Sequence, residues 1–517
     1  MSESIETKTK FVTKKVVIYL IIIITIGFLI RFYYFPYGIP ITLDGIRYFL
    51  YAMDTSVLGH LPMGYTLPNN GWSLFLSIFF SAFHLDNFLD YITLQRVLTV
   101  TISVATAIPV YFLCKRFFEN TFALVGAALF IFEPRIIQNS LLGTTDPLFI
   151  FLVITSLLLF FSHNKIAIYF SFVIAALSAL VRYEGLLLII PFSIMFFVKY
   201  KNQPKIVLRY SMVLCLFVLI LLPMVYLRIE TTGKDGLLSH IISGAKVTTT
   251  EGSIIADSQS KFSLVEGVYN LVKYLGYVLV PTFIIFIPLG LFLFFKNRNY
   301  NSNTLIITGV IMLIPALYAY GRGFQEPRYL FVIFPVLGII SLYMLKKIVS
   351  KFQKQNIVLI MIVGAVLITS VVFLEYKKID SEHEKEAMQL SLLIHNLEGG
   401  VNEYYPESNY VEIAGMYNEK FPTLSSSIQY GTHVISLDGS SIEDIVKLGK
   451  SKGLSYLVVD NLNDKPHRKS FFNDLFYHEE KYPYLVKKFD SKEHGYNYQV
   501  KIFKIDYEKF EELNQKP

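Results

Sequence analysis

The sequence predicts an α-helical polytopic membrane protein with a C-terminal soluble α/β domain. Three observations predict this fold class: the apolar composition, the separation of apolar and charged regions along the chain, and the placement of the lysines. Hydrophobic residues make up 53% of the 517 residues, with 44 phenylalanines and 35 tyrosines, and the mean hydropathy is +0.47. A soluble globular protein interrupts its apolar runs with charge more often, so the composition excludes that class.

Apolar runs dominate residues 15–375, where only short basic clusters separate them, whereas residues 1–14 form a polar, basic tail. A transmembrane helix needs about 20 apolar residues. On this basis we expect about 11 transmembrane helices, near residues 15–35, 94–114, 120–137, 146–162, 166–181, 185–199, 206–227, 271–295, 304–320, 329–345 and 357–375. The first run is followed by no small-residue cleavage site, so we interpret it as an uncleaved span rather than a signal peptide.

The lysines predict the orientation of these helices. Segment 71–84 is apolar but only about 14 residues long, a length that suits an interfacial or re-entrant helix better than a span. If it does not cross, every lysine-bearing short loop falls on one face, which the positive-inside rule makes cytoplasmic. The tail 1–14 is then cytoplasmic, and an odd number of spans places residues 376–517 outside the cytoplasm. The outer face also receives the loops 36–93 and 228–270.

The segment 376–517 has the mixed charge of a soluble domain. A helix is predicted at 441–453, because acidic residues come early in this stretch and a glycine closes it. Short apolar runs predict strands, at 411–416, 432–436, 454–460, 484–490 and 498–505.

Charge and cysteine content exclude several other functions. The net charge is +7, but its lysines lie mostly in short interhelical loops, where membrane topology explains them, so no nucleic-acid partner is expected. The two cysteines, Cys114 and Cys215, offer neither a disulfide framework nor metal-ligand spacing.

The first outer loop carries one candidate catalytic acid in the stretch TLDGIRYFLYAMD, residues 42–54. Asp44 and Tyr48 are four residues apart and would share one face of a helix, with Arg47 beside them. The apolar residues of this stretch suit a helix that lies at the membrane interface. An exposed acid that caps the helix would give the same pattern.

A second acid, Asp146, stands one residue before the proline that opens the expected fourth span. Its carboxylate could simply cap that helix ahead of Pro147. The functional interpretation is that Asp44 and Asp146 converge on one outward cavity. There they could supply a general base, hold a divalent cation, or do both.

Arginines supply the complementary charge on the same predicted face: Arg96 at the second span, Arg182 in VRYEG, and Arg322 and Arg328 around GFQEP. Arginine binds phosphate through two parallel hydrogen bonds, so a rim of arginines beside two acids suggests an anionic substrate at membrane level. Helix-end snorkelling, or pairing with Glu184 and Glu326, is the alternative. The candidate substrate-binding residues are Tyr48, Arg47, Arg96, Arg182, Tyr183, Glu184, Arg328 and Tyr329.

The motifs resemble those of GT-C membrane glycosyltransferases. The resemblance rests on Asp44 with Tyr48, and on PNNGWSLFLSIFF, LQRVLTV, TTDPLFIFL, ALVRYEGLLL and QEPRYLFVIFP in this order, so that it covers roughly residues 15–345. The chain is most similar to the dolichyl-phosphate-mannose protein mannosyltransferase and aminoarabinose-lipid transferase branch. The oligosaccharyltransferase signature WWDYG is absent, and the single tryptophan is Trp72.

The resemblance implies a sugar donor on a polyprenyl or dolichyl phosphate and a protein, glycan or lipid acceptor that attacks C1 on the outer face with inversion. Asp44 corresponds to the first-loop catalytic acid of the family, and Asp146 to the acid that opens a later span; Arg182 and Arg328 fall where donor contacts are expected. Protein mannosyltransferases usually have two adjacent acids in the first loop, whereas Gly45 follows Asp44 here. This difference counts against protein Ser/Thr as the acceptor.

Two other functions fit a polytopic membrane protein: a lipid or sugar transporter or flippase, and a non-catalytic scaffold with an outer binding domain. Transporters concentrate polar groups near the midplane and on broken helices. Here most expected spans lack ionisable residues in their interiors and the acids cluster at one rim. This distribution favours chemistry at the membrane surface.

Overall fold

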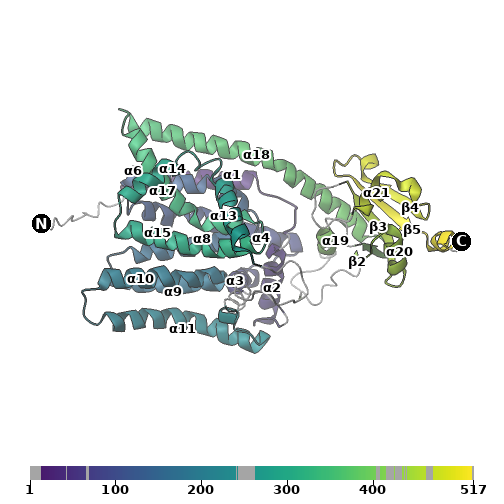
Figure 1. The fold of residues 1–517 in the computed structure, drawn as a ribbon, viewed down its shortest axis with the longest axis horizontal. Coiled ribbons are helices and arrows are strands. Elements are labelled where there is room, and N and C mark those ends of the chain that lie inside the picture. The colour runs from purple at the N-terminus through teal and green to yellow at the C-terminus, as the bar shows by residue number, and fades with distance from the viewer. Residues whose placement is uncertain are drawn as a thin grey trace. The chain divides into compact units, whose positions relative to one another are not determined.

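The computed structural model describes residues 13–41, 44–63, 65, 69–239, 242, 262–402, 408–414, 424, 434–435, 437, 439–461 and 470–514 (Figure 1). Contacts between Cα atoms divide the chain into two units, which are described separately. The first unit comprises residues 1–35, 60–76 and 95–374, and the second comprises 36–59, 77–94 and 375–517.

The first unit is built from helices, of which α8, α9, α10, α11 and α15 run alongside one another in Figure 1. Its helices are α1 (Lys14–Tyr33), α5 (Ala107–Cys114), α6 (Asn120–Ile131), α7 (Pro134–Ser140), α8 (Asp146–Phe160), α9 (Lys165–Val181), η1 (Tyr183–Leu188), α10 (Ile189–Tyr200), α11 (Ile206–Thr232), α13 (Leu264–Leu279), α14 (Ile287–Lys296), α15 (Tyr300–Met312), α16 (Ile314–Gly321), η2 (Pro327–Ile333) and α17 (Phe334–Val349). Three helices contribute to both units: α3 (Gly71–Ala82), α4 (Phe88–Ala105) and α18 (Gln355–His395).

Within the described residues, seven helical stretches are long and apolar enough to cross a membrane. They are Lys14–Tyr33, Phe88–Cys114, Tyr183–Tyr200, Ile206–Thr232, Tyr300–Gly321, Pro327–Val349 and Gln355–His395. The pair α6 and α7, bent by 55°, raises the number to eight if it forms one span. The prediction of a polytopic helical membrane protein is therefore confirmed.

The other expected spans are also helical, but they are shorter. Helices α8 and α9 have 15 and 17 residues, and the expected span 271–295 is divided between the end of α13 and most of α14. The ambiguous segment 71–84 contains α3, which has 12 residues.

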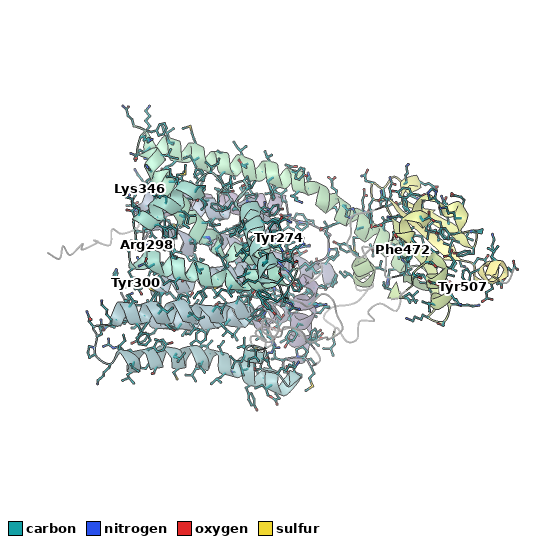
Figure 2. The ribbon with its side chains drawn as sticks, viewed as in Figure 1. Tyr274, Arg298, Tyr300, Lys346, Phe472 and Tyr507 are labelled. Atoms are coloured by element: carbon teal, nitrogen blue, oxygen red, sulfur yellow. The ribbon has the colours of Figure 1, made fainter. Side chains whose placement is uncertain are left out.

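Basic side chains mark one end of the first unit. Figure 2 shows Arg298 and Lys346 at the same end of the bundle, near Tyr300, whereas Tyr274 lies toward the opposite end. Arg298 follows α14 and Lys346 lies in the last turn of α17. This arrangement agrees with the clustering of the lysines that the loop pattern predicts.

The break between α6 and α7 leaves backbone groups that lipid cannot satisfy, and buried side chains satisfy them. Glu133 is fully buried and its Oε2 accepts hydrogen bonds from the backbone N–H groups of Arg135 and Ile136, at 2.7 and 3.0 Å. Arg31, also fully buried, donates to the Ile131 carbonyl at 3.1 Å. The Ser370 hydroxyl donates to the Phe132 carbonyl.

Arg31 connects this break to two neighbouring helices. Its Nε donates to the Ser140 hydroxyl at 3.0 Å and its Nη2 to the Ser103 hydroxyl at 3.2 Å. Because Ser103 lies on α4 and Ser140 ends α7, one side chain of α1 joins three other parts of the unit.

The second unit contains the C-terminal mixed sheet, in the strand order β2-β1-β3-β5-β4. Strands β1 and β2 are parallel, as are β1 and β3, and β5 pairs antiparallel with both β3 and β4. The elements of this region are β1 (Gly400–Asn402), α19 (Ser408–Ala414), β2 (Val434–Ile435), α20 (Ile442–Lys450), β3 (Leu454–Asp460), α21 (Phe471–Tyr477), η5 (Glu479–Lys481), β4 (Leu485–Asp490), η6 (Ser491–His494), β5 (Val500–Ile505) and α22 (Tyr507–Asn514).

Two apolar clusters stabilise this sheet. One contains Leu457 and Phe503, and the other contains Val458 and Ile502. Since successive residues of a strand point to opposite faces, the sheet is covered on both sides. Figure 2 marks Phe472, which belongs to the first cluster, and Tyr507, which packs against it. Burial raises the pKa of Tyr507 to about 12, so the hydroxyl keeps its proton and donates to the Leu454 carbonyl at 2.7 Å.

The predicted helix at 441–453 and the strands at 454–460, 484–490 and 498–505 are confirmed as α20, β3, β4 and β5. The predicted strand at 432–436 is seen as β2 over residues 434–435; its other positions lie outside the described residues. The predicted strand at 411–416 is wrong, because residues up to Ala414 belong to the helix α19. Tyr410, Val411 and Ala414 are buried in the second cluster at helical spacing, which a short apolar run does not distinguish from a strand.

The first-loop helix α2 (Asp44–Leu58) also belongs to the second unit. Phe49 contacts Phe80 and Phe88, with ring centroids 5.4 and 5.3 Å apart, and Phe80 contacts Tyr91 at 5.2 Å. This aromatic cluster fixes α2 against parts of α3 and α4.

We expect Arg31→Leu to lower the free energy of unfolding by about 3 kcal/mol, because it leaves buried carbonyl and hydroxyl groups without a donor. Chemical denaturation of the purified protein in detergent measures this change. Arg298→Leu, on an exposed arginine, is the matched control. Equal stability of the two variants would show that the Arg31 contacts do not hold the break together.

Candidate functional site

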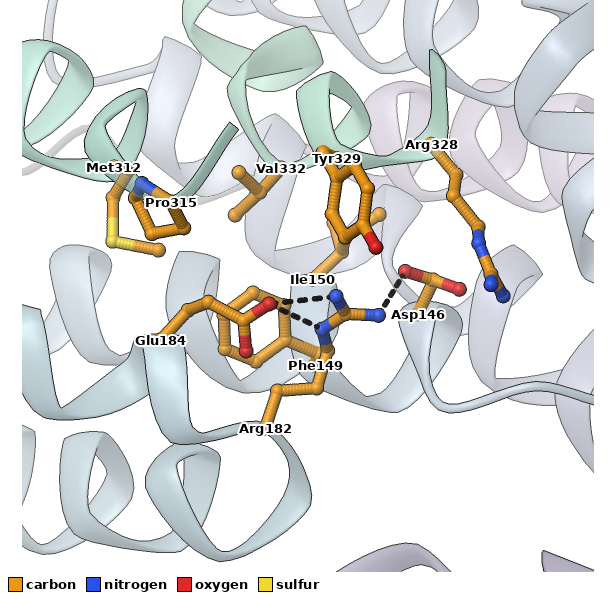
Figure 3. A pocket seen from close by; sticks show the side chains of 10 residues that line it. All are labelled: Asp146, Phe149, Ile150, Arg182, Glu184, Met312, Pro315, Arg328, Tyr329 and Val332. Atoms are coloured by element: carbon orange, nitrogen blue, oxygen red, sulfur yellow. Dashed lines mark hydrogen bonds and ion pairs between the residues drawn. The ribbon is translucent and has the colours of Figure 1, made fainter. Parts of the chain in front are cut away.

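The centre of the candidate site is the Arg182 guanidinium, which lies between two carboxylates (Figure 3). Nη1 is 2.8 Å from Asp146 Oδ1, and Nη2 is 2.7 Å from Glu184 Oε1. Nε also donates to Glu184 Oε1, at 3.2 Å. The side chains of Asp146 and Glu184 are only 5% and 6% exposed, and that of Arg182 is 13% exposed. The structure thus brings Asp146 together with Arg182 and Glu184, which follow it by more than 30 positions in the sequence, in one nearly buried ionic cluster.

Arg182 and Glu184 occupy a tight connection between α9 and η1. Arg182 ends α9 in an extended conformation, and the 3-10 helix η1 starts at the next residue. A Cβ atom at Gly185 would lie 2.5 Å from the Ala179 nitrogen and from the Ser178 hydroxyl oxygen. Only glycine permits this approach, so Gly185 lets the chain fold back against α9 and aims Arg182 and Glu184 at the same point.

Asp146 is the first residue of α8, and Pro147 follows it as expected. The alternative that its carboxylate caps the helix is not what the structure shows. The N-cap position is Thr145, whose side chain makes no capping hydrogen bond, and the Asp146 carboxylate accepts from Arg182 and from the Thr144 hydroxyl at 3.0 Å. The first turn of a helix also favours a negative charge electrostatically.

The helix η2 closes the other side of the pocket. Arg328 and Tyr329 both line it, and the Arg182 guanidinium carbon lies 5.9 Å from the centre of the Tyr329 ring and 5.7 Å from that of Phe149. Arg328 Nε lies 3.3 Å from Glu326 Oε2. The pairing of arginines with Glu184 and Glu326 that the sequence left as an alternative is therefore present.

The pocket is narrow: of about 320 Å³ of space between atoms, which includes open solvent, the enclosed part has room for about one water molecule. Its wall also contains Ile150, Met312, Pro315 and Val332. One apolar side and one ionic side meet in it, so it suits the junction between a lipid chain and a charged headgroup.

Three side chains hold the turn before Asp146: Trp72, Gln95 and Arg96, of which the sequence singled out only Arg96, as a candidate substrate-binding residue. Residues 141–145 separate α7 from α8, and the carbonyl groups at this turn accept hydrogen bonds from other helices. Trp72 Nε1 and Gln95 Nε2 both donate to the Gly143 carbonyl, at 3.2 and 2.6 Å. Arg96 Nε donates to the Leu141 carbonyl at 3.0 Å.

Arg96 therefore positions the turn before Asp146 through a backbone contact. The Thr99 hydroxyl, one helical turn further along α4, donates to the Ser140 carbonyl at 2.8 Å. The motif LQRVLTV supplies the Gln95, Arg96 and Thr99 contacts, and that function explains its polar residues within an apolar helix. The one signal in the sequence for these roles is the presence of polar side chains, Gln95 and Arg96, inside an expected span.

The motif PNNGWS serves the same region. A Cβ atom at Gly71 would lie 2.7 Å from the carbonyl carbon of Leu180, two residues before Arg182. Asn70 accepts a hydrogen bond from Arg228 Nη1 at 2.9 Å, and both side chains are buried. The end of α9 is thus packed against a glycine, and α11 is fixed to the same segment.

The other sequence-predicted residues fall into two groups. Tyr183 is the first residue of η1 and is half-buried next to the cluster. Asp44, Arg47 and Tyr48 lie on α2, where Tyr48 is buried and Arg47 exposed. Since α2 belongs to the second unit and Asp146 to the first, the convergence of Asp44 with Asp146 stays a prediction.

The metal hypothesis concerns the same two acids. Within the part of the chain that the structure describes, no group of three or more His, Cys, Asp or Glu side chains could hold a metal ion. Both Asp146 oxygens already accept hydrogen bonds from Arg182 and Thr144. A cation at Asp146 would have to share the carboxylate with the Arg182 guanidinium.

Comparison with known proteins shows what the chain is similar to. Residues 73–227 match the family model described as dolichyl-phosphate-mannose-protein mannosyltransferase. This range contains Gln95, Asp146 and Arg182. Over this range the chain is similar to that family of membrane glycosyltransferases. No curated protein sequence matches the chain.

The fold of the chain is similar to that of two solved structures. The oligosaccharyltransferase of Archaeoglobus fulgidus in its apo form has 13% sequence identity and a TM-score of 0.57, over 88% of this chain and 70% of that chain. ArnT from Cupriavidus metallidurans bound to undecaprenyl phosphate has 12% identity and a TM-score of 0.50, over 77% of this chain and 68% of that chain.

A third similar structure is archaeal AglB from Archaeoglobus fulgidus in complex with an inhibitory peptide and a dolichol-phosphate. It has 12% identity and a TM-score of 0.51, over 87% of this chain and 70% of that chain. The similarity to an oligosaccharyltransferase concerns the fold, since the chain lacks the WWDYG signature.

We expect Gly185→Ala to lower sugar transfer about a hundredfold, because the added carbon moves the Arg182–Glu184 turn, and a misplacement of about 1 Å has an effect of that size. Transfer from a radiolabelled lipid-phosphate sugar by the purified enzyme measures it. The control is Gly276→Ala in α13, where a Cβ atom meets nothing within 4 Å. Unchanged transfer by the Gly185 variant would contradict the role of this turn.

Proposed function

We propose that the protein is a membrane glycosyltransferase, which transfers a hexose such as mannose from a polyprenyl- or dolichyl-phosphate donor to an acceptor on the extracytoplasmic face, with inversion at the anomeric carbon. The observation that carries the proposal is the nearly buried Asp146–Arg182–Glu184 cluster, which lies in the part of the chain that matches the family model and lines a pocket with an apolar side.

The proposed topology has eleven spans. The seven candidate spans, the bent pair α6–α7, the short helices α8 and α9, and the α13–α14 region correspond to the eleven apolar segments of the sequence. The lysine-bearing loops then face the cytoplasm. Residues 376–517, with the mixed sheet, and the ends of the spans that carry Asp146 and Arg182 face outward.

The donor class is supported by three observations. ArnT is bound to undecaprenyl phosphate in one similar structure, and AglB is bound to a dolichol-phosphate in another. In the chain itself, Arg182 and Arg328 line one pocket together with Phe149, Ile150 and Val332. Guanidinium groups suit a phosphate and the apolar residues suit the first isoprenoid units of its tail.

In the proposed reaction, the acceptor oxygen forms a bond to C1 of the sugar while the bond from C1 to the phosphate oxygen breaks. The acceptor proton moves to the Asp44 carboxylate, and the electron pair of the broken bond leaves with the polyprenyl phosphate. Arg182 and Arg328 stabilise the negative charge of the leaving phosphate. A phosphate oxygen competes with Asp146 for the Arg182 guanidinium, so donor binding alters this ion pair.

The acceptor is a protein, glycan or lipid hydroxyl. The glycine after Asp44 departs from the paired acids of protein mannosyltransferases. A glycan or lipid acceptor therefore fits the first loop better than a protein serine or threonine.

We expect Asp44→Asn to lower the transfer rate by about two to four orders of magnitude, since it removes the proposed general base without changing the size of the side chain. The measurement is single-turnover transfer from a radiolabelled polyprenyl-phosphate sugar, with circular dichroism to check the fold. The control is Asp86→Asn, an exposed acid of the same loop. Full turnover in the Asp44 variant would remove this residue from the reaction.

We expect Arg182→Lys to raise the KM for the lipid-phosphate donor about tenfold and to leave the KM for the acceptor unchanged. Lysine keeps the charge beside Asp146 and Glu184 but loses the planar pair of donors that suits a phosphate. Initial rates at varied donor concentration measure the effect, with Arg298→Lys as the control at the opposite end of the bundle. A change in the KM for the acceptor alone would contradict the proposal, because Arg182 would then contact the acceptor and not the donor.

A further inference from the structure

A second cavity shares no lining residue with the Asp146 pocket. It is a groove between α1, α6 and α18, with about 1090 Å³ of space between atoms, including the part open to the outside. All three helices belong to the first unit where they line it. The proposed transfer reaction uses none of its residues.

The groove starts at the N-terminal ends of its three helices. Its polar residues are Lys15, Thr121 and Asn356, each the second residue of its helix. Its apolar residues extend about two turns further, to Ile23 on α1, Ala128 on α6 and Val363 on α18. A polar mouth therefore opens into an apolar channel that runs along the helix axes.

The mouth is suited to an anion. The N-terminus of a helix carries a partial positive charge and unsatisfied N–H groups. The N-cap residues of α1 and α6, Thr13 and Glu119, make no capping hydrogen bond through their side chains. Lys15 has no ion-pair partner among the described residues. Lys14 precedes it in α1, and Lys354 comes directly before α18. Glu119 supplies the opposing charge, so the mouth keeps a net positive charge.

The walls are open to lipid. Helices α1 and α18 have only 17% and 22% of their apolar windows buried. Leu124 and Leu359 form the buried floor of the groove, at 9% and 3% exposed, while Ile360 on its edge is 71% exposed. An acyl chain along this floor would cover apolar surface that the protein leaves uncovered.

We propose that this groove binds an anionic phospholipid from the leaflet on the side of the lysine-bearing loops. Lys15 and the three helix N-termini hold the headgroup phosphate, and one acyl chain lies on Leu124 and Leu359. The phospholipid fixes α1 to α18, two helices with few other packed neighbours, at the end of the bundle opposite to the Asp146 pocket.

The test is native mass spectrometry of the full-length protein after reconstitution in vesicles with equal amounts of phosphatidylglycerol and phosphatidylcholine, followed by mild detergent extraction. The wild type is expected to retain phosphatidylglycerol in preference to phosphatidylcholine. Lys15→Gln should lower the retained phosphatidylglycerol about fivefold, as expected for one lysine at a membrane surface. Lys346→Gln, an exposed lysine outside the groove at the same end, should retain it as the wild type does.

Ile360→Trp fills the groove from its exposed edge and leaves Lys15 in place, so it should lower the retention of both lipids. Equal retention by wild type, Lys15→Gln and Ile360→Trp would overturn the proposal. Equal retention of the two phospholipids by the wild type would overturn the recognition of charge. Preferential retention of added undecaprenyl phosphate over phosphatidylglycerol would overturn the choice of occupant.

Discussion

The membrane-embedded unit depends on one constraint: backbone groups within a bilayer have to find their hydrogen-bond partners inside the protein. The chain departs from helix geometry at residues 132–133 and again at 141–145, between α6, α7 and α8. Five carbonyl groups at these breaks each accept a hydrogen bond from a side chain of another segment. They belong to Ile131, Phe132, Ser140, Leu141 and Gly143. Without these donors the chain could not interrupt its helices there, and Asp146 could not begin a new helix beside Arg182.

This constraint explains why the recognisable motifs of the chain are spread over distant segments. Trp72, Gln95 and Arg96 touch the backbone of the turn before Asp146, whereas Asp146, Arg182 and Glu184 touch one another. The first three position the turn and the last three form the ionic cluster. Mutational effects at the two sets therefore have different physical origins, although both sets lie in motifs that carry the family resemblance.

The sequence predicted the helical membrane architecture well because hydropathy and helix length report it directly. It also predicted that Arg182, Glu184 and Asp146 matter, since ionisable residues at the ends of apolar runs are costly. It did not predict that Asp146 contacts Arg182, because a pairing across 36 positions depends on how α8 packs against α9. Arg31, Glu133 and Arg135 were missed because they lie inside expected spans, where their partners are backbone atoms that no residue pattern reveals.

Arg31 and Arg182 show how contacts separate two roles that the sequence cannot tell apart. Both stand near the end of an apolar helix. Arg31 is fully buried and all its partners are neutral carbonyl and hydroxyl oxygens, so removing any of them leaves a buried charge without compensation. Arg182 lines a pocket and its main partners are two carboxylates, so a phosphate that binds there competes with them for the guanidinium. An arginine held by neutral groups fixes the fold, and one held by exchangeable anions is suited to bind a charged substrate.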